Sequence, residues 1–155
     1  MLEVDGQTLA QSNAINRYVG KLADLYPTDP WQAALCDEVM EAVEDIGTKI
    51  AGTLFLPEEQ KKAQRQALVE GAIPFYLTRL QQRLEAHGGR YFADDRLSVA
   101  DLKMFVWIRH LKSGALDHVP TDLPDRVAPK LVEHHERVKK DPRIKGYYAN
   151  HGVAG

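Results

Sequence analysis

The stretch LSVADLKMFVWIRHLKSG, residues 97–114, decides how the rest of the chain must fold. Ser98 and Asp101 have the spacing of a helix N-cap and its N3 residue, with Asp in place of the usual Glu or Gln of a capping box, and Leu97 and Leu102 flank them as a hydrophobic staple. The helix that follows is apolar on nearly every side, through Val99, Ala100, Leu102, Met104, Phe105, Val106, Trp107 and Ile108. A helix that is hydrophobic all round is buried, so we expect a capped central helix surrounded by others.

Apolar periodicity and helix breakers place further helices around it. Residues 29–52 carry an apolar residue every three or four positions, at Trp31, Leu35, Val39, Ala42, Ile46 and Ile50. A helix that begins near Pro57 should bend or split at Gly71 and Pro74, because proline removes a backbone donor and crowds the preceding turn. Residues 126–140 form the last long helix, and Pro142 starts a short terminal turn or helix.

The first residues follow a different pattern. LEV, the pair Asp5–Gly6 and QTL predict a hairpin, because this pair supplies the positive φ angles that a two-residue turn needs. A helix begins at Ser12, ends near Asp24, and is followed by the chain-breaking YPTDP. Two strands alone are marginal in water, so the hairpin needs a partner sheet. The expected fold is mainly α, divided into residues 1–26 and an all-helical body at residues 27–155.

Composition narrows the class of protein. The 155 residues are 44% hydrophobic and 27% charged, which is typical of a globular chain. A net charge of −2 gives no general attraction to nucleic acid or to an anionic membrane. The single cysteine, Cys36, allows neither an intramolecular disulfide nor a cysteine zinc site, and an inert packed thiol is the favoured interpretation. With no secretory signal pattern and no apolar run long enough to span a membrane, a cytoplasmic location is expected.

Gln11–Ser12, at the junction of strand and helix, is the first candidate site. Ser12 could simply be an N-cap, since serine is favoured there. Alternatively, the free N–H groups and the positive dipole end of the helix, with the two side chains, could hold an anionic group of a small ligand. Both interpretations remain open on the sequence.

An acidic stripe is the second candidate. Asp37, Glu41, Glu44 and Asp45 are expected on one face of the 29–52 helix. They could form a solvated face, or some could meet a cationic group of a ligand or partner subunit, or a divalent ion. The adjacent His134 and His135 point to different faces and cannot chelate together, so surface or cap roles are favoured, and no metal site is predicted from any histidine.

Taken together, the strand–DG–strand–QS–helix junction, the acidic helix and the capped SVAD helix resemble the glutathione S-transferases, a family of detoxification enzymes, and most of all their sigma-like, tyrosine-type branch. The similarity extends over essentially the whole chain. It implies that residues 1–26 are the last part of a thioredoxin-like domain and that residues 27–155 are the all-α domain. It also implies glutathione as substrate, a small electrophile as second substrate, and a homodimer.

The resemblance also assigns roles to residues. Gln11 and Ser12 match the pair that holds the γ-glutamyl carboxylate of glutathione, and Asp45 matches an acid that reaches the ligand of the neighbouring subunit. Ser98 and Asp101 match a structural cap that serves folding. Beside Asp45, Glu41 and Glu44 fall where some relatives gather acids that attract a divalent ion, and Thr48 and Gly52 fall near the electrophile pocket.

One departure from the family is large. The family's catalytic tyrosine lies on a first strand that precedes anything matched in this chain, and no residue here is a substitute. The expectation is therefore an N-terminally truncated transferase that is inactive alone. The alternative is a non-catalytic structural or protein-interaction module of the same family.

Overall fold

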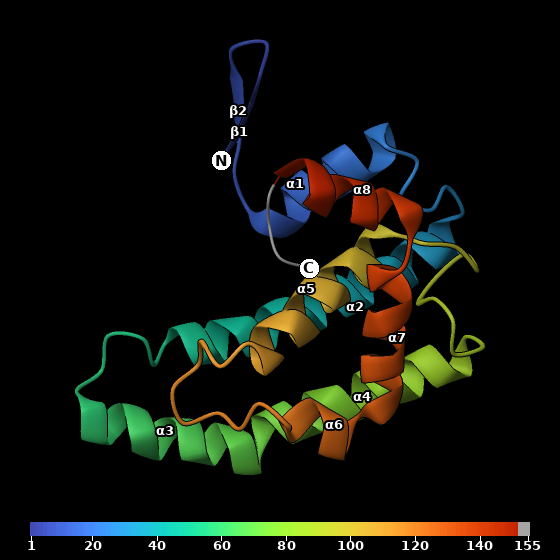
Figure 1. Cartoon of the computed structure of the whole chain (residues 1–155). Coiled ribbons are helices and arrows are strands. Elements are labelled where there is room, and N and C mark those ends of the chain that lie inside the picture. Colours follow the sequence, from blue (N-terminus) through green and yellow to red (C-terminus); the bar gives the residue numbers. More distant parts are fainter. Residues whose placement is uncertain (152–155) are drawn as a thin grey trace.

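The structure, a computed structural model, describes residues 1–151 and is mainly helical (Figure 1). A short hairpin, β1 (Leu2–Val4) and β2 (Gln7–Leu9), is followed by helix α1 (Ser12–Leu22). The helices after it are α2 (Pro30–Ala51), α3 (Glu58–Glu70), α4 (Ala72–Ala86), α5 (Val99–Lys112), α6 (Leu123–Val127), α7 (Pro129–Lys139) and α8 (Pro142–His151). None of the helices described is long and apolar enough to cross a membrane.

The predicted hairpin is confirmed. The strands pair antiparallel with Leu2 opposite Leu9, and the turn residues Asp5 and Gly6 have φ angles of 50° and 77°. Positive φ at both positions is what a type I′ turn requires, and its twist matches that of the strands. The hairpin projects away from the helices (Figure 1), and no other strand of the described chain pairs with it.

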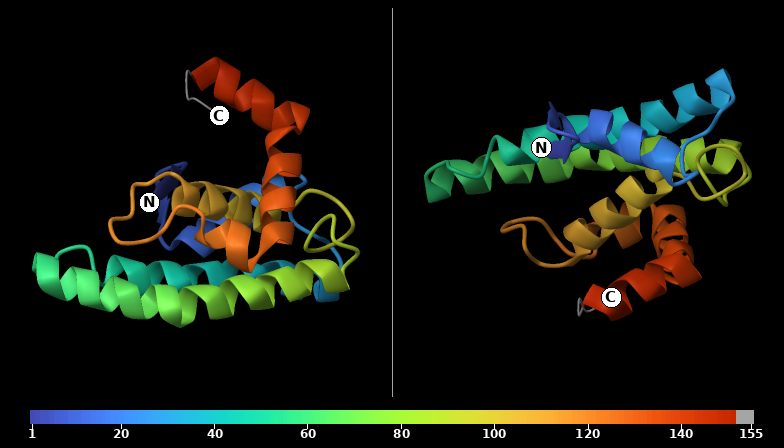
Figure 2. Two further views of the ribbon diagram at one scale, coloured as in Figure 1. Left: turned by 60° about the horizontal axis from the view of Figure 1, so that its bottom comes forward. Right: turned by 90° about the horizontal axis from the view of Figure 1, so that it is seen from above.

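The helical body is built around α5, as the sequence predicts. Helix α2 packs on α4 and on α5, and α7 packs on the other side of α5 (Figure 2). The long segment after Pro57 is split into α3 and α4 at Gly71, which confirms the expected break. Apolar side chains of α2, α4, α5 and α7 form one continuous core.

The capping box of α5 is present in full. The Ser98 side chain accepts from the Asp101 backbone N–H, and Asp101 Oδ2 accepts from the Ser98 backbone N–H at 2.8 Å. The Ser98 hydroxyl also donates to Asp101 Oδ2, at 2.7 Å, and both residues are buried. The staple residues Leu97 and Leu102 belong to a small apolar cluster with Phe105. The N-terminus of the central helix is thus fixed by local contacts, and the loss of such a cap costs about 1 kcal/mol.

The structure corrects three expectations about the helices. Trp31 is 69% exposed, because it lies in the first turn of α2, before that helix reaches the core. Val106 is 57% exposed, so α5 is not buried on all sides. The expected last long helix is two helices, because Ala128, with φ −142° and ψ 63°, leaves helical geometry and Pro129 starts α7 afresh.

Candidate functional site

The N-terminus of α1 has no side-chain cap. Gln11, not Ser12, is the N-cap residue, and its backbone has φ 71° and ψ 121°. Ser12 is the first helical residue, so the first of the two interpretations left open by the sequence, that Ser12 is the N-cap, is wrong. The N–H groups of the first turn carry the positive end of the helix dipole. A non-glycine residue with this φ is strained by about 1–3 kcal/mol.

The Ser12 hydroxyl instead contacts α2. Its Oγ donates to Glu44 Oε2 at 2.8 Å, and Lys103 Nζ of α5 donates to the same carboxylate oxygen at 2.6 Å. Lys103 also donates to Asn13 Oδ1, and its side chain is only 13% exposed. The hydrogen bonds from Lys103 and Ser12 hold the pKa of Glu44 below its ordinary value. This polar cluster therefore joins the first turn of α1 to α2 and α5.

A second ion-pair cluster holds the middle of α1. Arg17 Nε donates to Asp37 Oδ1 at 2.8 Å, and Arg17 Nη2 donates to Glu41 Oε1 at 2.6 Å. Tyr26 also donates to Asp37 Oδ1, at 2.9 Å; burial, with this hydrogen bond, raises the pKa of Tyr26 to about 12. The Arg17 hydrogen bond lowers the pKa of Glu41. Since α1 buries only Asn13 and Gly20, these contacts are a large part of its docking.

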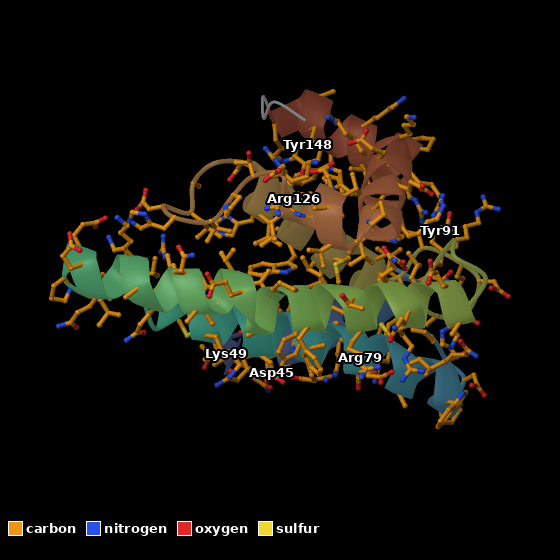
Figure 3. All side chains as sticks on the ribbon, turned by 90° about the horizontal axis from the view of Figure 1, so that it is seen from below. Asp45, Lys49, Arg79, Tyr91, Arg126 and Tyr148 are labelled. Atoms are coloured by element: carbon orange, nitrogen blue, oxygen red, sulfur yellow. The ribbon has the colours of Figure 1, made fainter. Side chains whose placement is uncertain are left out.

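The acidic stripe is thus divided between two sides of α2. Asp37, Glu41 and Glu44 face α1 or Lys103, whereas Asp45 accepts from the Tyr76 hydroxyl of α4 at 3.3 Å. Successive helix residues are about 100° apart, so Glu44 and Asp45 cannot share one direction. Figure 3 shows Asp45 together with Lys49 and Arg79 on one side of the molecule, and Arg126 and Tyr148 on the opposite side.

A cavity of about 620 Å³ lies between α1, α2 and α5. Its wall is mostly apolar, and it includes Val19, Leu25, Val43, Val99, Leu102, Val106 and Trp107. Ser12, Glu44 and Lys103 also line it, and so does His110. An apolar cavity with a polar cluster and a helix N-terminus beside it could bind a ligand that has an anionic end and an apolar body.

The other predicted site residues lie elsewhere. Gly47 lines the cavity, whereas Thr48 and Gly52 do not line it and are exposed on α2 and at its end. Cys36 is fully buried, and burial raises the pKa of its thiol to about 11, as an inert packed thiol should behave. Within residues 1–151, no group of three or more His, Cys, Asp or Glu side chains is placed to hold a metal ion.

Sequence reasoning missed a buried pair in the body. His134 is fully buried and not a surface residue: its Nε2 lies 2.8 Å from Asp101 Oδ1, across the contact between α7 and α5. Lys103 was also missed, although a lone lysine in the apolar MFVWI region, opposite an acidic helix, was a usable signal. Pairing either residue required knowing which helices pack together.

Comparison with known proteins assigns the family. Residues 44–151 match the sequence profile of the family described as "Glutathione S-transferase, C-terminal domain". The chain belongs to the glutathione S-transferase superfamily, whose members use glutathione as a substrate. It is 31% identical over 123 residues to glutathione S-transferase A2 of Bos taurus. The aligned residues cover 77% of this chain and 55% of that relative. The chain thus spans little more than half the length of the first three curated relatives, 55–56%.

Solved structures share the architecture. A structure of prostaglandin synthase D of Nilaparvata lugens aligns with a TM-score of 0.82 at 26% identity, over 95% of this chain and 71% of that one. A sigma class glutathione S-transferase of Fasciola hepatica aligns with a TM-score of 0.78 at 22% identity, over 95% of this chain and 68% of that one. The fold is therefore the helical C-terminal domain of the glutathione S-transferases, preceded by a fragment of a thioredoxin-like fold.

Proposed function

We propose that the protein to which this chain belongs is a sigma-like glutathione S-transferase that conjugates glutathione to small electrophiles. The chain would supply the anchor for the γ-glutamyl carboxylate of glutathione at Gln11 and Ser12. The observation that carries this proposal is the uncapped N-terminus of α1 beside the apolar cavity. Free N–H groups at a helix start suit a carboxylate, and the apolar wall suits the electrophile.

The described residues offer little to activate the glutathione thiol. No tyrosine or cysteine is among the described residues that line the cavity, and its one serine donates its hydrogen to Glu44. The family resemblance places the activating tyrosine on a strand that this chain does not match. We therefore expect the 155-residue chain to bind glutathione weakly and to show little or no turnover by itself.

Two measurements on the 155-residue chain test this proposal. Calorimetry should detect weak glutathione binding that is reduced in Ser12→Ala but not in Ser113→Ala, a matched serine at the end of α5. Conjugation of chlorodinitrobenzene, a generic aromatic electrophile, should stay near the uncatalysed rate. Turnover at an ordinary transferase rate would show that the thiol-activating group has been misplaced, and equal binding by both variants would remove Ser12 from the site.

A second candidate function is a non-catalytic module of the same family, which recognises proteins or serves a structural role. The same lack of a tyrosine or cysteine in the described cavity wall favours it. A glutathione titration separates the two. Saturable binding that depends on Ser12 supports the transferase, whereas no binding at millimolar glutathione supports the module.

We also propose that the protein is a cytoplasmic homodimer in which Asp45 reaches the ligand of the neighbouring subunit. Within each subunit we propose a domain boundary between residues 26 and 27. The side of α2 and α4 that carries Asp45 also exposes Phe75 and Arg79, so one face offers both signs of charge and an apolar ring (Figure 3). Such a face can be self-complementary across a two-fold axis. Sedimentation of wild type and Arg79→Glu tests it, since the variant should shift toward monomer.

A further inference from the structure

The Ser12 hydroxyl has a single hydrogen, and Glu44 takes it. A serine hydroxyl donates one hydrogen bond, and the 2.8 Å contact from Ser12 Oγ to Glu44 Oε2 uses it. A ligand carboxylate is acceptor-only, so it needs that same hydrogen to bind this side chain. At this position the protein's own carboxylate and a ligand carboxylate therefore compete for one donor.

We propose that Glu44 is a built-in competitor of the ligand at the glutathione site: binding of the γ-glutamyl carboxylate transfers the Ser12 hydrogen bond from Glu44 to the ligand. This inference rests on the proposed function, and it adds two positioning residues, Glu44 and Lys103, that neither the sequence nor the family comparison assigns to the carboxylate anchor.

Lys103 stabilises the Glu44 carboxylate during this exchange. Its ammonium lies 2.6 Å from Glu44 Oε2 and is held in place by Asn13, so Glu44 keeps a cationic partner when it gives up Ser12. The exchange requires that Glu44 can move and that Lys103 stays in place. The Glu44 side chain is 49% exposed and can turn outward, whereas the Lys103 side chain is only 13% exposed. Lys103 thus keeps Glu44 ionised and near Ser12.

The nearest charged groups on α1 and α2 outside the cluster are paired with one another. Arg17 of α1, one turn from Ser12, donates to Asp37 and Glu41, and Glu41 lies one turn before Glu44 on α2. His110 of α5 lines the same cavity. The charge beside Ser12 is therefore set by Lys103 and the ionised Glu44. The lowered pKa of Glu44 agrees with this arrangement. As the pH falls through that pKa, Glu44 becomes neutral and the competition weakens.

The test compares glutathione affinity among variants of the 155-residue chain by calorimetry. Glu44→Gln removes the charge and keeps the shape, and a neutral acceptor competes less well for a hydrogen than a carboxylate does. We expect glutathione to bind about threefold more tightly, the equivalent of one ordinary hydrogen bond. The control Glu133→Gln makes the same charge change at a half-exposed glutamate of α7 that is paired with Lys130, and should leave the affinity unchanged.

Two further results separate competition from a general charge effect. In a Ser12→Ala background, the threefold gain in affinity from Glu44→Gln should disappear, because the Ser12 contact couples the two positions. The wild-type affinity should rise as the pH falls through the Glu44 pKa and should be flatter in Glu44→Gln. Lys103→Met should raise the pKa of Glu44, measured by its carboxyl ¹³C titration, and Lys103→Arg should restore it.

The outcomes distinguish the inference from the proposed function. Glutathione binding that is unaffected by Glu44→Gln, or a gain that is equal with and without Ser12, overturns the competition. A Glu44 that titrates at its ordinary value in the wild type overturns it without any ligand. No binding by any variant, with Glu44 still titrating low, removes the proposed function, and the competition with it.

Discussion

The Asp101 carboxylate contacts four polar groups in the core, and we predict that Asp101→Asn is strongly destabilising. Its Oδ2 accepts from the Ser98 backbone N–H and hydroxyl, and its Oδ1 accepts from the Phe92 N–H at 3.1 Å and lies 2.8 Å from His134 Nε2. Asp101 and His134 are fully buried. Asparagine has nearly the same shape, so the change tests hydrogen bonding and not packing.

The magnitude follows from the geometry. An amide has one acceptor oxygen, so in either orientation its NH₂ group faces a fixed backbone N–H, that of Phe92 or that of Ser98. A buried donor left without an acceptor costs about 1–3 kcal/mol, and the remaining bonds lose the part of their strength that came from the charge. The sum is about 3–5 kcal/mol, a large share of the usual stability of about 5–15 kcal/mol.

Urea unfolding followed by circular dichroism measures this loss. Asp125→Asn is the control, since Asp125 is an exposed partner of Lys112 and a surface ion pair contributes about 0–1 kcal/mol. If Asp101→Asn fails to fold, Ser98→Ala gives a second measurement, with an expected loss of about 1–2 kcal/mol. A loss below about 1 kcal/mol for a folded Asp101→Asn would refute the reasoning.

Three further predictions concern α1 and the thiol. Gly20→Ala places a Cβ 2.7 Å from Val99 Cγ1, so despite alanine's better helix propensity we expect faster amide exchange in α1. Arg17→Met removes the partner that lowers the pKa of Glu41. The stability that this pair gives is present above the ordinary pKa of glutamate and is lost as the pH falls through the lowered pKa of Glu41. The urea midpoints of variant and wild type should therefore differ at neutral pH and converge in acid. Cys36 is fully buried and its pKa is raised to about 11, so it should react with a disulfide reagent only after unfolding. The absorbance of the released thiol measures this reaction.

A control variant accompanies Gly20→Ala, and one contradicting result can be named for Arg17→Met and one for Cys36. Gly47→Ala in α2 has no atom within 4 Å of the added Cβ, so it should leave exchange in α1 unchanged and stabilise the chain by about 0.5–1 kcal/mol. A constant difference between Arg17→Met and wild type at all pH values would show that Glu41 is not the titrating partner. Rapid labelling of Cys36 in the native chain would contradict its burial.

Several elements were predictable because their signals are local. The hairpin turn at Asp5–Gly6, the break at Gly71 and the box of Ser98 and Asp101 all depend on residues within a few positions of one another. The family could be stated on the same grounds, since its motifs lie in order along the chain. Local backbone preferences and side-chain caps act before any packing does.

The predictions that were wrong depended on distant neighbours. Ser12 has the right residue type for a cap, yet it is the first residue inside α1, and its hydroxyl donates to Glu44, 32 residues away. Trp31 fits the apolar stripe of α2 but lies beyond the end of the core. His134 looked like a surface residue because its partner lies 33 residues away, on a helix whose contact with α7 no local pattern indicates.

By itself, therefore, the sequence determined the helices and hairpin, the cap of the central helix and the family, because these are properties of short stretches and of their order. Only the tertiary structure decided which carboxylate meets which cation, where the cavity lies, and that Glu44 and Lys103, 59 residues apart, meet at the Ser12 hydroxyl. The physical reason is that such contacts depend on how helices cross, and crossing is fixed by the packing of whole faces.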